Sequence, residues 1–358
     1  MEKILMMSAE STGDPYITLL KISLLKEGIK INFPKRFYNY FPFIRNCFLS
    51  NCRNLHIHWI QYFSGSKGRN YYITIKKMFF FIIDVLITKY ILRAKFVWTV
   101  HNLYTHDSSY LQIDKLGRKF FSRIVDGIIC HCNQAKREIQ KIYEVSPKKI
   151  HIIPYGNVQE FYKNEISKDD AREFLNLKKE TFIFCHYGRI KPYKGVFDLI
   201  NSFKALNQNE NIKLMVIGAP RTDELKAHIL DISKNTENII LKLDFVPNDD
   251  VQYYINASDI IVVSYKKILT SGVVIMAITF GKPIIAPKLG CITETLDENG
   301  AILYDSHEKD GLKNALKKTL ELKDKLLKMG HYNFNLAKKL KWENIGKQTI
   351  RVYSKYLK

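Results

Sequence analysis

Two cations and one helix start in the second half of the chain could bind phosphate. Arg189 follows an apolar run, and Lys194 comes just before a segment with helical periodicity. A guanidinium can hold a phosphate through two hydrogen bonds, and an ammonium adds a second positive charge. Residues 270–272, Thr-Ser-Gly, open a further helix, whose first N–H groups are a ready site for phosphate or a sugar hydroxyl. Together these groups would compensate a diphosphate and the charge that builds on it as a bond to it breaks.

The segment that carries this helix start, residues 258–287, has the pattern strand, polar loop, helix, strand. Tyr265 lies in the polar loop. The helix that follows is apolar on almost every side, which predicts that it packs between other elements. Gly281 fits the position just past the helix end. Ligands of doubly wound sheets bind beyond the carboxyl ends of parallel strands, so the loop is a candidate binding site.

Strands and helices alternate through both halves of the chain. The expected strands lie at 3–8, 55–59, 96–100, 124–132 and 149–153 in the first half, and at 182–187, 213–217, 239–245, 259–263 and 300–304 in the second. This alternation predicts an α/β chain with two doubly wound, Rossmann-like domains that face each other across a cleft. A polar stretch at 158–178 predicts the linker, so we expect one domain at 1–165 and a second at 166–341.

Polar and aromatic residues follow the expected strands of the first domain. His101 comes directly after the strand at 96–100, and Trp59 ends the strand at 55–59. A histidine in this position lies over the edge of the sheet where ligands bind; a core or capping histidine is the alternative. Gly13, Asp14 and Tyr16 follow the first strand and are candidate ligand contacts. A plain helix start, with Asp14 as N-cap and proline at the first helical position, explains the same residues.

The net charge of +21 is unusual for a chain of 358 residues. Residues 1–170 hold 26 Lys and Arg against 14 Asp and Glu, so the excess is spread along the chain. Nucleic acid, an anionic membrane surface and a polyphosphate ligand all fit such a charge. A compositional bias of the source genome is the alternative. No motif of interleaved basic and aromatic residues supports nucleic acid, and we expect none as a partner.

One stretch, residues 78–92, approaches membrane character. It is only about 15 residues long and contains Asp84 and Lys89, so it is too short and too charged to span a bilayer. Lysines and an arginine flank its aromatic and aliphatic residues, a pattern typical of a helix that lies at a membrane interface. A buried helix of an α/β domain explains the same pattern.

The sequence gives no sign of a cofactor or a metal site. Neither domain has the G-x-G-x-x-G fingerprint of dinucleotide binding. The six cysteines lack the spacing of a disulfide framework or a zinc site, so we expect core thiols, a reducing compartment and no metal.

Motifs in both halves resemble those of family 4 glycosyltransferases, two-domain enzymes of GT-B fold. Residues 188–195, Gly-Arg-Ile-Lys-Pro-Tyr-Lys-Gly, are similar to that family's G-R-x-x-x-x-K-G motif. Further similar segments occur in the family's order: residues 56–59, 99–102, 153–157, 245–247, 259–262, Tyr265 and 280–283. The closing helix, residues 342–358 with Trp342, matches the helix that in such enzymes packs back on the first domain.

This resemblance implies transfer of a sugar from a nucleotide-diphosphate donor, with retained anomeric configuration and without a metal. The second domain would bind the donor and the first the acceptor, a glycan or lipid-linked molecule of cell-surface polysaccharide or glycolipid synthesis. His101, Arg189 and Lys194 would be the catalytic residues. The donor would contact Gly188, Tyr265, Thr270, Ser271, Gly272 and Glu294, and the acceptor would contact Gly13, Asp14, Tyr16 and Trp59. The enzyme would be cytoplasmic, with the inner membrane face as its place of action.

One departure from the family's pattern concerns two glutamates. Aligned on residues 281–283, their positions hold Ile268 and Met276, which cannot bind sugar or ribose hydroxyls. Thr270, Ser271 and Glu294 are the candidate substitutes. A divergent enzyme is the preferred interpretation, and a non-catalytic partner of another transferase is the alternative.

Overall fold

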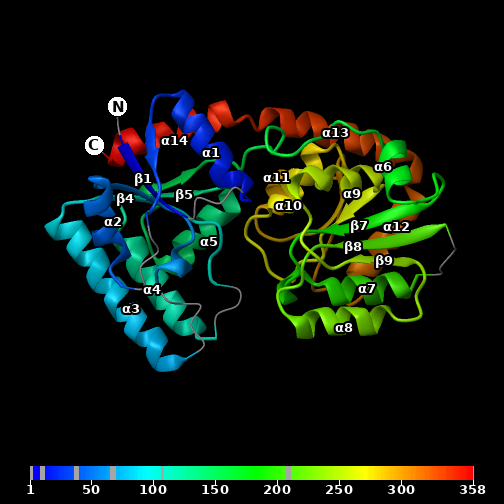
Figure 1. Ribbon diagram of the computed structural model, residues 1–358, viewed down its shortest axis with the longest axis horizontal. Coiled ribbons are helices and arrows are strands. Elements are labelled where there is room, and N and C mark those ends of the chain that lie inside the picture. The colour runs from blue at the N-terminus through cyan, green and yellow to red at the C-terminus, as the bar shows by residue number, and fades with distance from the viewer. Residues whose placement is uncertain are drawn as a thin grey trace. The chain divides into compact units, whose positions relative to one another are not determined.

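The computed structural model describes residues 3–8, 13–35, 40–64, 70–105, 109–206 and 211–357, which form two compact units (Figure 1). Unit 1 comprises Met1–Tyr155 and Trp342–Lys358, and unit 2 comprises Gly156–Lys341. Each unit contains one six-stranded parallel sheet with helices between the strands. The predicted class, α/β with two doubly wound sheets, is confirmed.

Unit 1 has the strand order β2-β1-β3-β4-β5-β6. Its strands are β1 (Lys3–Met7), β2 (Lys30–Asn32), β3 (Asn54–Ile57), β4 (Lys95–Thr99), β5 (Gly127–Cys130) and β6 (Ile150–Ile152). Its helices are α1 (Pro15–Lys26), α2 (Pro42–Ser50), α3 (Tyr71–Leu86), α4 (Leu111–Ile124), α5 (Asn133–Tyr143) and α14 (Trp342–Tyr356), with a π-helix at Ile87–Ile91 and 3₁₀ turns at Ile60–Tyr62 and Pro147–Lys149. The direction of winding reverses between β1 and β3, the place where doubly wound sheets bind ligands.

The carboxyl-terminal helix α14 belongs to unit 1, where it packs against α1. The contact is close, because a Cβ added at Gly346 would lie 2.4 Å from the Ser23 hydroxyl. Farther along the helix, the Tyr353 hydroxyl lies 2.6 Å from Nδ1 of His56 on β3. The last helix of the chain is thus part of the core beneath the first sheet.

Unit 2 has the strand order β12-β11-β10-β7-β8-β9. Its strands are β7 (Phe182–Tyr187), β8 (Ile212–Ile217), β9 (Ile239–Lys242), β10 (Ile260–Val262), β11 (Ile284–Pro287) and β12 (Ala301–Tyr304). Its helices are α6 (Lys168–Phe174), α7 (Val196–Lys204), α8 (Asp223–Ser233), α9 (Val251–Ala257), α10 (Gly272–Thr279), α11 (Ile292–Thr295), α12 (Gly311–Glu321) and α13 (Leu326–Lys339), with 3₁₀ turns at Pro192–Lys194, Asn248–Asp250 and Lys323–Lys325. Winding reverses between β7 and β10, so the loops after these two strands flank the expected ligand site.

The segment predicted as a linker is a structured part of unit 2. The chain divides between Tyr155 and Gly156, not after residue 165. Asn157 donates from its backbone N–H to the Leu340 carbonyl at 2.9 Å and from its side chain to the Ala337 carbonyl at 3.0 Å. The polar composition of this segment predicts a linker. It does not reveal these hydrogen bonds, because they join residues far apart in the sequence.

The Gly281-Lys282 pair serves the fold of unit 2. Gly281 has a φ of +64° just beyond α10, as the sequence predicts. The Lys282 ammonium donates to the carbonyls of Asn256 and Ser258, both at 2.9 Å, where α9 ends. A cation at a helix carboxyl terminus satisfies its unpaired carbonyls, so this lysine stabilises α9.

Candidate functional site

The loops after β7 and β10 are joined at the switch point of unit 2. The Ser264 hydroxyl donates to the Lys194 carbonyl, and the Lys266 N–H donates to the Tyr193 carbonyl, both at 2.8 Å. Gly195 has a φ of +66°, and a Cβ there would lie 2.0 Å from the Ser264 carbonyl oxygen. Only glycine allows this backbone conformation and this approach, so the second glycine of the 188–195 motif fixes one loop against the other.

Gly188, Lys194 and the first turn of α10 converge at one point. Gly188 has a φ of +103°, and a Cβ added there would lie 3.2 Å from Nζ of Lys194 and 3.3 Å from a methyl group of Val273. The bare backbone after β7 therefore lies beside an ammonium and beneath a helix amino terminus. Both groups favour a negatively charged ligand.

The Lys194 side chain is 9% exposed, and its ammonium has neither a hydrogen bond nor an ion pair with any described residue. Its Nζ lies 5.9 Å from the ring centroid of Tyr265. Burial and, to a smaller extent, the charge of Lys191 together lower the pKa of Lys194 to about 8. His186, on β7, is buried and neutral, because burial lowers its pKa to about 3. A buried cation without a counter-charge is costly, and a bound anion would remove that cost.

The amino terminus of α10 offers backbone donors. Ser271 is the N-cap, and its hydroxyl accepts from the Val274 N–H at 3.3 Å and lies 3.0 Å from the Tyr265 hydroxyl. The N–H groups of Gly272 and Val273 have no partner in the described part of the chain. The predicted helix start is confirmed, but the Ser271 hydroxyl is occupied by the cap and by Tyr265.

The remaining predicted donor contacts lie around this point in different environments. Arg189 is exposed, and no described carboxylate pairs with it. Thr270 is half-buried, with its hydroxyl 3.9 Å from Sγ of Cys291. Glu294 is exposed on the short helix α11, and Met276 is buried in α10. Of the residues predicted to replace the two missing glutamates, Thr270 is half-buried and Glu294 is exposed. These two are therefore the candidates that a ligand can reach.

Three histidines meet at the carboxyl edge of the first sheet. His58 follows β3, His101 follows β4 and His131 follows β5, and all three side chains are buried. Nδ1 of His58 lies 3.1 Å from Nε2 of His101, and Nδ1 of His101 lies 3.4 Å from Nε2 of His131. Burial lowers the pKa of His131 to about 4 and the pKa values of His58 and His101 well below the usual range. The three rings are neutral at physiological pH.

The hydrogen bonds fix which nitrogen of each neutral ring carries the proton. Nδ1 of His131 must donate to the Ile153 carbonyl at 2.9 Å, because a carbonyl can only accept. Nε2 of His131 therefore accepts from Nδ1 of His101, and Nε2 of His101 accepts from Nδ1 of His58. The chain of hydrogen bonds ends at Nε2 of His58, a buried acceptor without a partner among the described residues. His101 consequently has both ring nitrogens engaged and meets a ligand only by exchanging one of these contacts.

Aromatic rings enclose this histidine chain. The Tyr16 ring is buried with its centroid 4.8 Å from that of His101 and 5.3 Å from that of His131. Trp59 is half-buried and stacks on His101, with centroids 4.7 Å apart and an interplanar angle of 17°. Tyr16 therefore packs the histidines from within the core, and Trp59 is the more exposed of the two predicted contacts.

The loop after β1 contains two predicted acceptor contacts, Gly13 and Asp14. Asp14 is the N-cap of α1 and accepts from the Ile17 N–H at 3.2 Å, with proline at the first helical position. Burial raises the pKa of Asp14. Gly13 is exposed just before the cap. The capping interpretation of Asp14 is thus confirmed, and a ligand contact by Gly13 or Asp14 stays a prediction.

Sequence reasoning assigned no role to His58, His131 or the buried pair of Asp114 and Arg118. The two histidines follow strands at the same edge as His101, so the rule that identified His101 applies to them also. Nε of Arg118 lies 3.1 Å from the Asp114 carboxylate, and Nη1 donates to the Asn102 carbonyl at 3.0 Å. This ion pair holds the loop that follows His101. Its i,i+4 spacing was visible in the sequence, but its burial was not.

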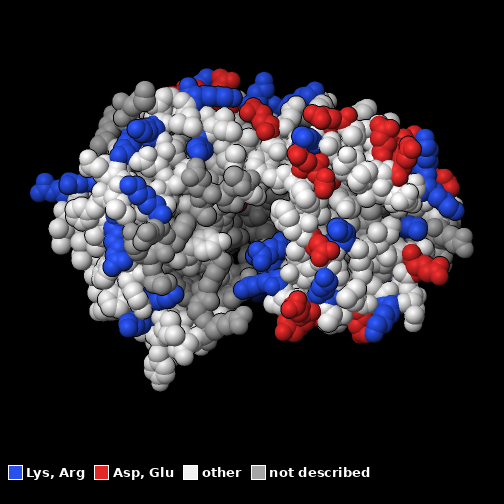
Figure 2. Space-filling model, viewed as in Figure 1, with Lys and Arg blue, Asp and Glu red and all other residues white. Residues whose placement is uncertain are grey.

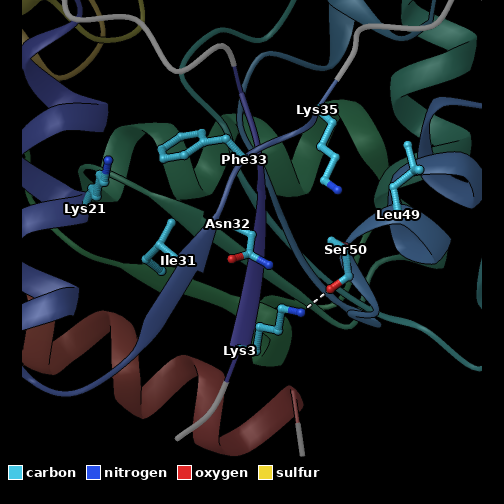
Figure 3. A pocket seen from close by; sticks show the side chains of 8 residues that line it. All are labelled: Lys3, Lys21, Ile31, Asn32, Phe33, Lys35, Leu49 and Ser50. Atoms are coloured by element: carbon cyan, nitrogen blue, oxygen red, sulfur yellow. Dashed lines mark hydrogen bonds between the residues drawn. The ribbon is translucent and has the colours of Figure 1, made fainter.

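Two other possible sites were considered within the described ranges. No cluster of three or more His, Cys, Asp or Glu side chains there could hold a metal ion. A separate pocket of about 430 Å³ lies beside β2 (Figure 3) and is lined by Lys3, Lys21, Ile31, Asn32, Phe33, Lys35, Leu49 and Ser50. The Lys3 ammonium donates to the Ser50 carbonyl, and Lys21 lies 5.3 Å from the Phe33 ring centroid. None of the residues that line this pocket belongs to the predicted site.

Two family models match this chain, one in each half. The model described as "Glycosyl transferases group 1" matches residues 167–335, and the model described as "Glycosyltransferase Family 4" matches residues 73–157. The first match contains Gly188, Lys194 and α10, and the second contains His101 and His131. The candidate residues of unit 1 and those of unit 2 thus fall in segments that resemble glycosyltransferases.

Individual relatives agree with these matches. Lipopolysaccharide 1,2-N-acetylglucosaminetransferase of Salmonella typhimurium is 26% identical over 56% of this chain and 55% of its own length. GDP-mannose:glycolipid 4-beta-D-mannosyltransferase of Xanthomonas campestris is 22% identical over 82% of this chain and 76% of its own length. The chain therefore spans little more than half the length of the Salmonella relative.

A solved structure shares the fold over the whole chain. Anabaena Alr3699/HepE, in complex with UDP-glucose, is 14% identical, with a TM-score of 0.75 over 99% of this chain and 100% of its own. The chain has the GT-B fold, and the family matches support a glycosyltransferase enzyme.

Proposed function

We propose that this chain transfers a sugar from a nucleotide-diphosphate donor to a glycan or lipid-linked acceptor in cell-surface polysaccharide or glycolipid synthesis. Unit 2 binds the donor, and unit 1 binds the acceptor. One observation carries the proposal: the buried, unpaired ammonium of Lys194 lies beside Gly188, next to the amino terminus of α10. A diphosphate is a ligand that such a group of donors fits.

The residues of unit 2 act on the leaving group in this proposal. Lys194 and the N–H groups of Gly272 and Val273 bind the diphosphate, and the exposed Arg189 adds a second cation from the loop after β7. As the bond between sugar and diphosphate breaks, negative charge grows on the diphosphate oxygens. Donors that are already in place stabilise this charge without reorganisation, and they need no metal ion.

The predicted residues of unit 1 bind the sugar and the acceptor in this proposal. His101 contacts the donor sugar, and Trp59, Gly13 and Asp14 contact the acceptor. Because the chain of hydrogen bonds leaves Nε2 of His101 as an acceptor, that nitrogen can accept a hydrogen bond from a sugar hydroxyl in place of the one from the His58 N–H. The names of the Salmonella and Xanthomonas relatives support a lipopolysaccharide or glycolipid acceptor. The inner membrane face as the place of action is part of the proposal.

Retention of configuration rests on the resemblance of the motifs alone, and the Xanthomonas relative is named for a beta linkage.

The direct test incubates the protein with UDP- and GDP-sugars and an acceptor lipid extract, and measures release of the nucleotide. We expect release with one donor, and a product whose anomeric proton coupling matches that of the donor. Absence of release with every donor, together with absence of UDP and GDP binding, contradicts the proposal. Binding without release supports the alternative, a non-catalytic partner subunit.

Binding of a nucleoside diphosphate is expected to weaken above pH 8. In the free protein Lys194 has a pKa of about 8, so it loses its charge as the pH rises through that value. A bound diphosphate favours the charged ammonium and raises its pKa, so binding at pH 9 takes up about one proton. Affinity then falls by up to about tenfold per pH unit above 8.

Calorimetry at pH 9 in two buffers of different ionisation enthalpy measures the proton uptake. Lys194→Arg is the matched control, because a guanidinium stays charged and should bind without proton uptake. An affinity that stays constant between pH 7.5 and 9.5 would show that Lys194 is not at the diphosphate.

A further inference from the structure

Helix α3 and the π-helix after it are apolar on the side that faces solvent. The buried side of α3 consists of Thr74, Met78, Phe81, Asp84 and Val85. Large apolar and aromatic side chains on the other side are 42–79% exposed: Tyr71, Tyr72, Ile73, Ile75, Phe79, Tyr90 and Ile91. A surface helix of a soluble domain normally carries polar residues there. Exposed large apolar side chains gathered along one helix mark an interaction site.

The two charged residues that interrupt this apolar stretch in the sequence point into the protein. The Asp84 carboxylate accepts from the N–H groups of Phe43 at 2.8 Å and Ile44 at 2.9 Å, where it caps α2. The Lys89 ammonium pairs with the Asp126 carboxylate at 2.6 Å. Neither charge is presented on the outer side, so the exposed surface is more apolar than the sequence suggests.

Positive charge surrounds the apolar surface. Lys76 and Arg93 are exposed, and Lys77 is half-buried. Residues 28–106 contain 12 Lys and Arg but a single acidic residue, the buried Asp84. The side of unit 1 along which α3 runs shows Lys and Arg and no Asp or Glu in Figure 2. No helix in the described part of the chain is long and apolar enough to cross a bilayer.

We propose that the outer side of α3 and of the adjoining π-helix binds the surface of an anionic lipid bilayer. Tyrosine, phenylalanine and isoleucine side chains enter the boundary between headgroups and acyl chains, and Lys76, Lys77 and Arg93 contact anionic headgroups. A second copy of the chain does not fit, because a two-fold contact would place these like charges against each other. The inference goes beyond the proposed function, since nothing in the unit 2 site requires it.

The first test measures flotation with vesicles of phosphatidylcholine alone and of phosphatidylcholine with phosphatidylglycerol. The wild-type protein is expected to bind only the anionic vesicles, less in high salt. Lys76→Glu/Lys77→Glu should lower this binding at least about 30-fold, because each lysine near an anionic surface contributes severalfold. The matched control is Lys317→Glu/Lys318→Glu, an exposed pair on α12 with the same change in charge. Equal loss in both variants would overturn the proposal, because it would assign binding to net charge alone.

The second test reports insertion of the helix. In the Tyr72→Trp variant, the emission of the introduced tryptophan should shift to shorter wavelength when anionic vesicles are added. In the Phe245→Trp variant, whose introduced tryptophan is at an exposed position of unit 2, it should not shift. Phe79→Ser should weaken binding about tenfold, and Phe245→Ser should not change it. A dimer in solution that Phe79→Ser separates would overturn the bilayer assignment. None of these measurements needs a sugar donor, so their failure leaves the transferase proposal unaffected.

Discussion

Lys194→Met is expected to raise the stability of unit 2 while it removes tight binding of a nucleoside diphosphate. The wild-type ammonium is buried without a counter-charge, and burial has lowered its pKa to about 8. Methionine fills a similar volume and removes the cost of the buried charge, so the free energy of unfolding should rise by about 1 kcal/mol. Loss of a buried charge partner typically costs roughly 2–5 kcal/mol of binding, so affinity should fall about 30-fold or more.

Lys282→Met is the matched control for this prediction. Lys282 lies in the same unit, is half-buried, and has a pKa of about 8 for the same first reason, desolvation. Its ammonium, however, donates to the carbonyls of Asn256 and Ser258. Its loss leaves these acceptors unsatisfied, so stability should fall by about 1–3 kcal/mol with diphosphate affinity unchanged.

Thermal unfolding and calorimetry with UDP and GDP separate the two variants. The expected results have opposite signs: one variant is more stable and does not bind, and the other is less stable and binds. A Lys194→Met protein that is destabilised and retains its affinity would assign this lysine to the fold. Lys194→Arg should retain part of the affinity, because the charge is kept although the geometry differs.

Acidification from pH 6.5 to about 4.5 is expected to unfold unit 1. His56, His58, His101 and His131 are buried, and burial lowers the pKa of His56 to about 3 and of His131 to about 4. Below pH 6.5 the unfolded chain binds protons at these residues and the folded chain does not, so stability falls with pH. Each histidine costs about 1.4 kcal/mol per pH unit.

Two carboxyl groups in the same unit act in the opposite direction. Burial raises the pKa of Asp84 to about 6, so below that pH the folded state gains a proton before the unfolded state does. Burial also raises the pKa of Asp14, which adds to this effect at lower pH. Asp84 offsets about one histidine and Asp14 offsets part of another. The net loss of roughly 3–4 kcal/mol per pH unit exceeds the stability of a typical domain within two to three units.

Tryptophan fluorescence measures this transition in unit 1 alone, because the three tryptophans, at positions 59, 98 and 342, all belong to it. His131→Gln removes one of the buried bases. Its free energy of unfolding should depend less steeply on pH between 6 and 4.5, by about 1.4 kcal/mol per unit, whatever its stability at pH 7. An unchanged slope would mean that His131 is already protonated in the folded state.

The sequence by itself determined the order of elements and the loops that carry the site. Strand β7 was predicted at its observed bounds, and α10 begins at Gly272 and ends before Gly281 as expected. These features depend on local patterns: apolar runs, a serine cap, and a glycine that can adopt positive φ. Gly188 and His101 lie at strand ends, and Lys194 lies in the loop after β7. These positions follow from the same local rules, because parallel strands bring their carboxyl ends to one edge.

Only the tertiary structure decided what these residues contact. Lys194 is buried without a partner among the described residues, whereas Lys282 is half-buried with two acceptors. This difference depends on segments some 25 to 70 residues away, which no local pattern encodes. The proton positions on His101 follow from two other strands, and the inward direction of Asp84 follows from the start of α2. Residue types fix which chemistry is available. Long-range packing fixes which groups stay charged, which stay neutral and which are left for a ligand.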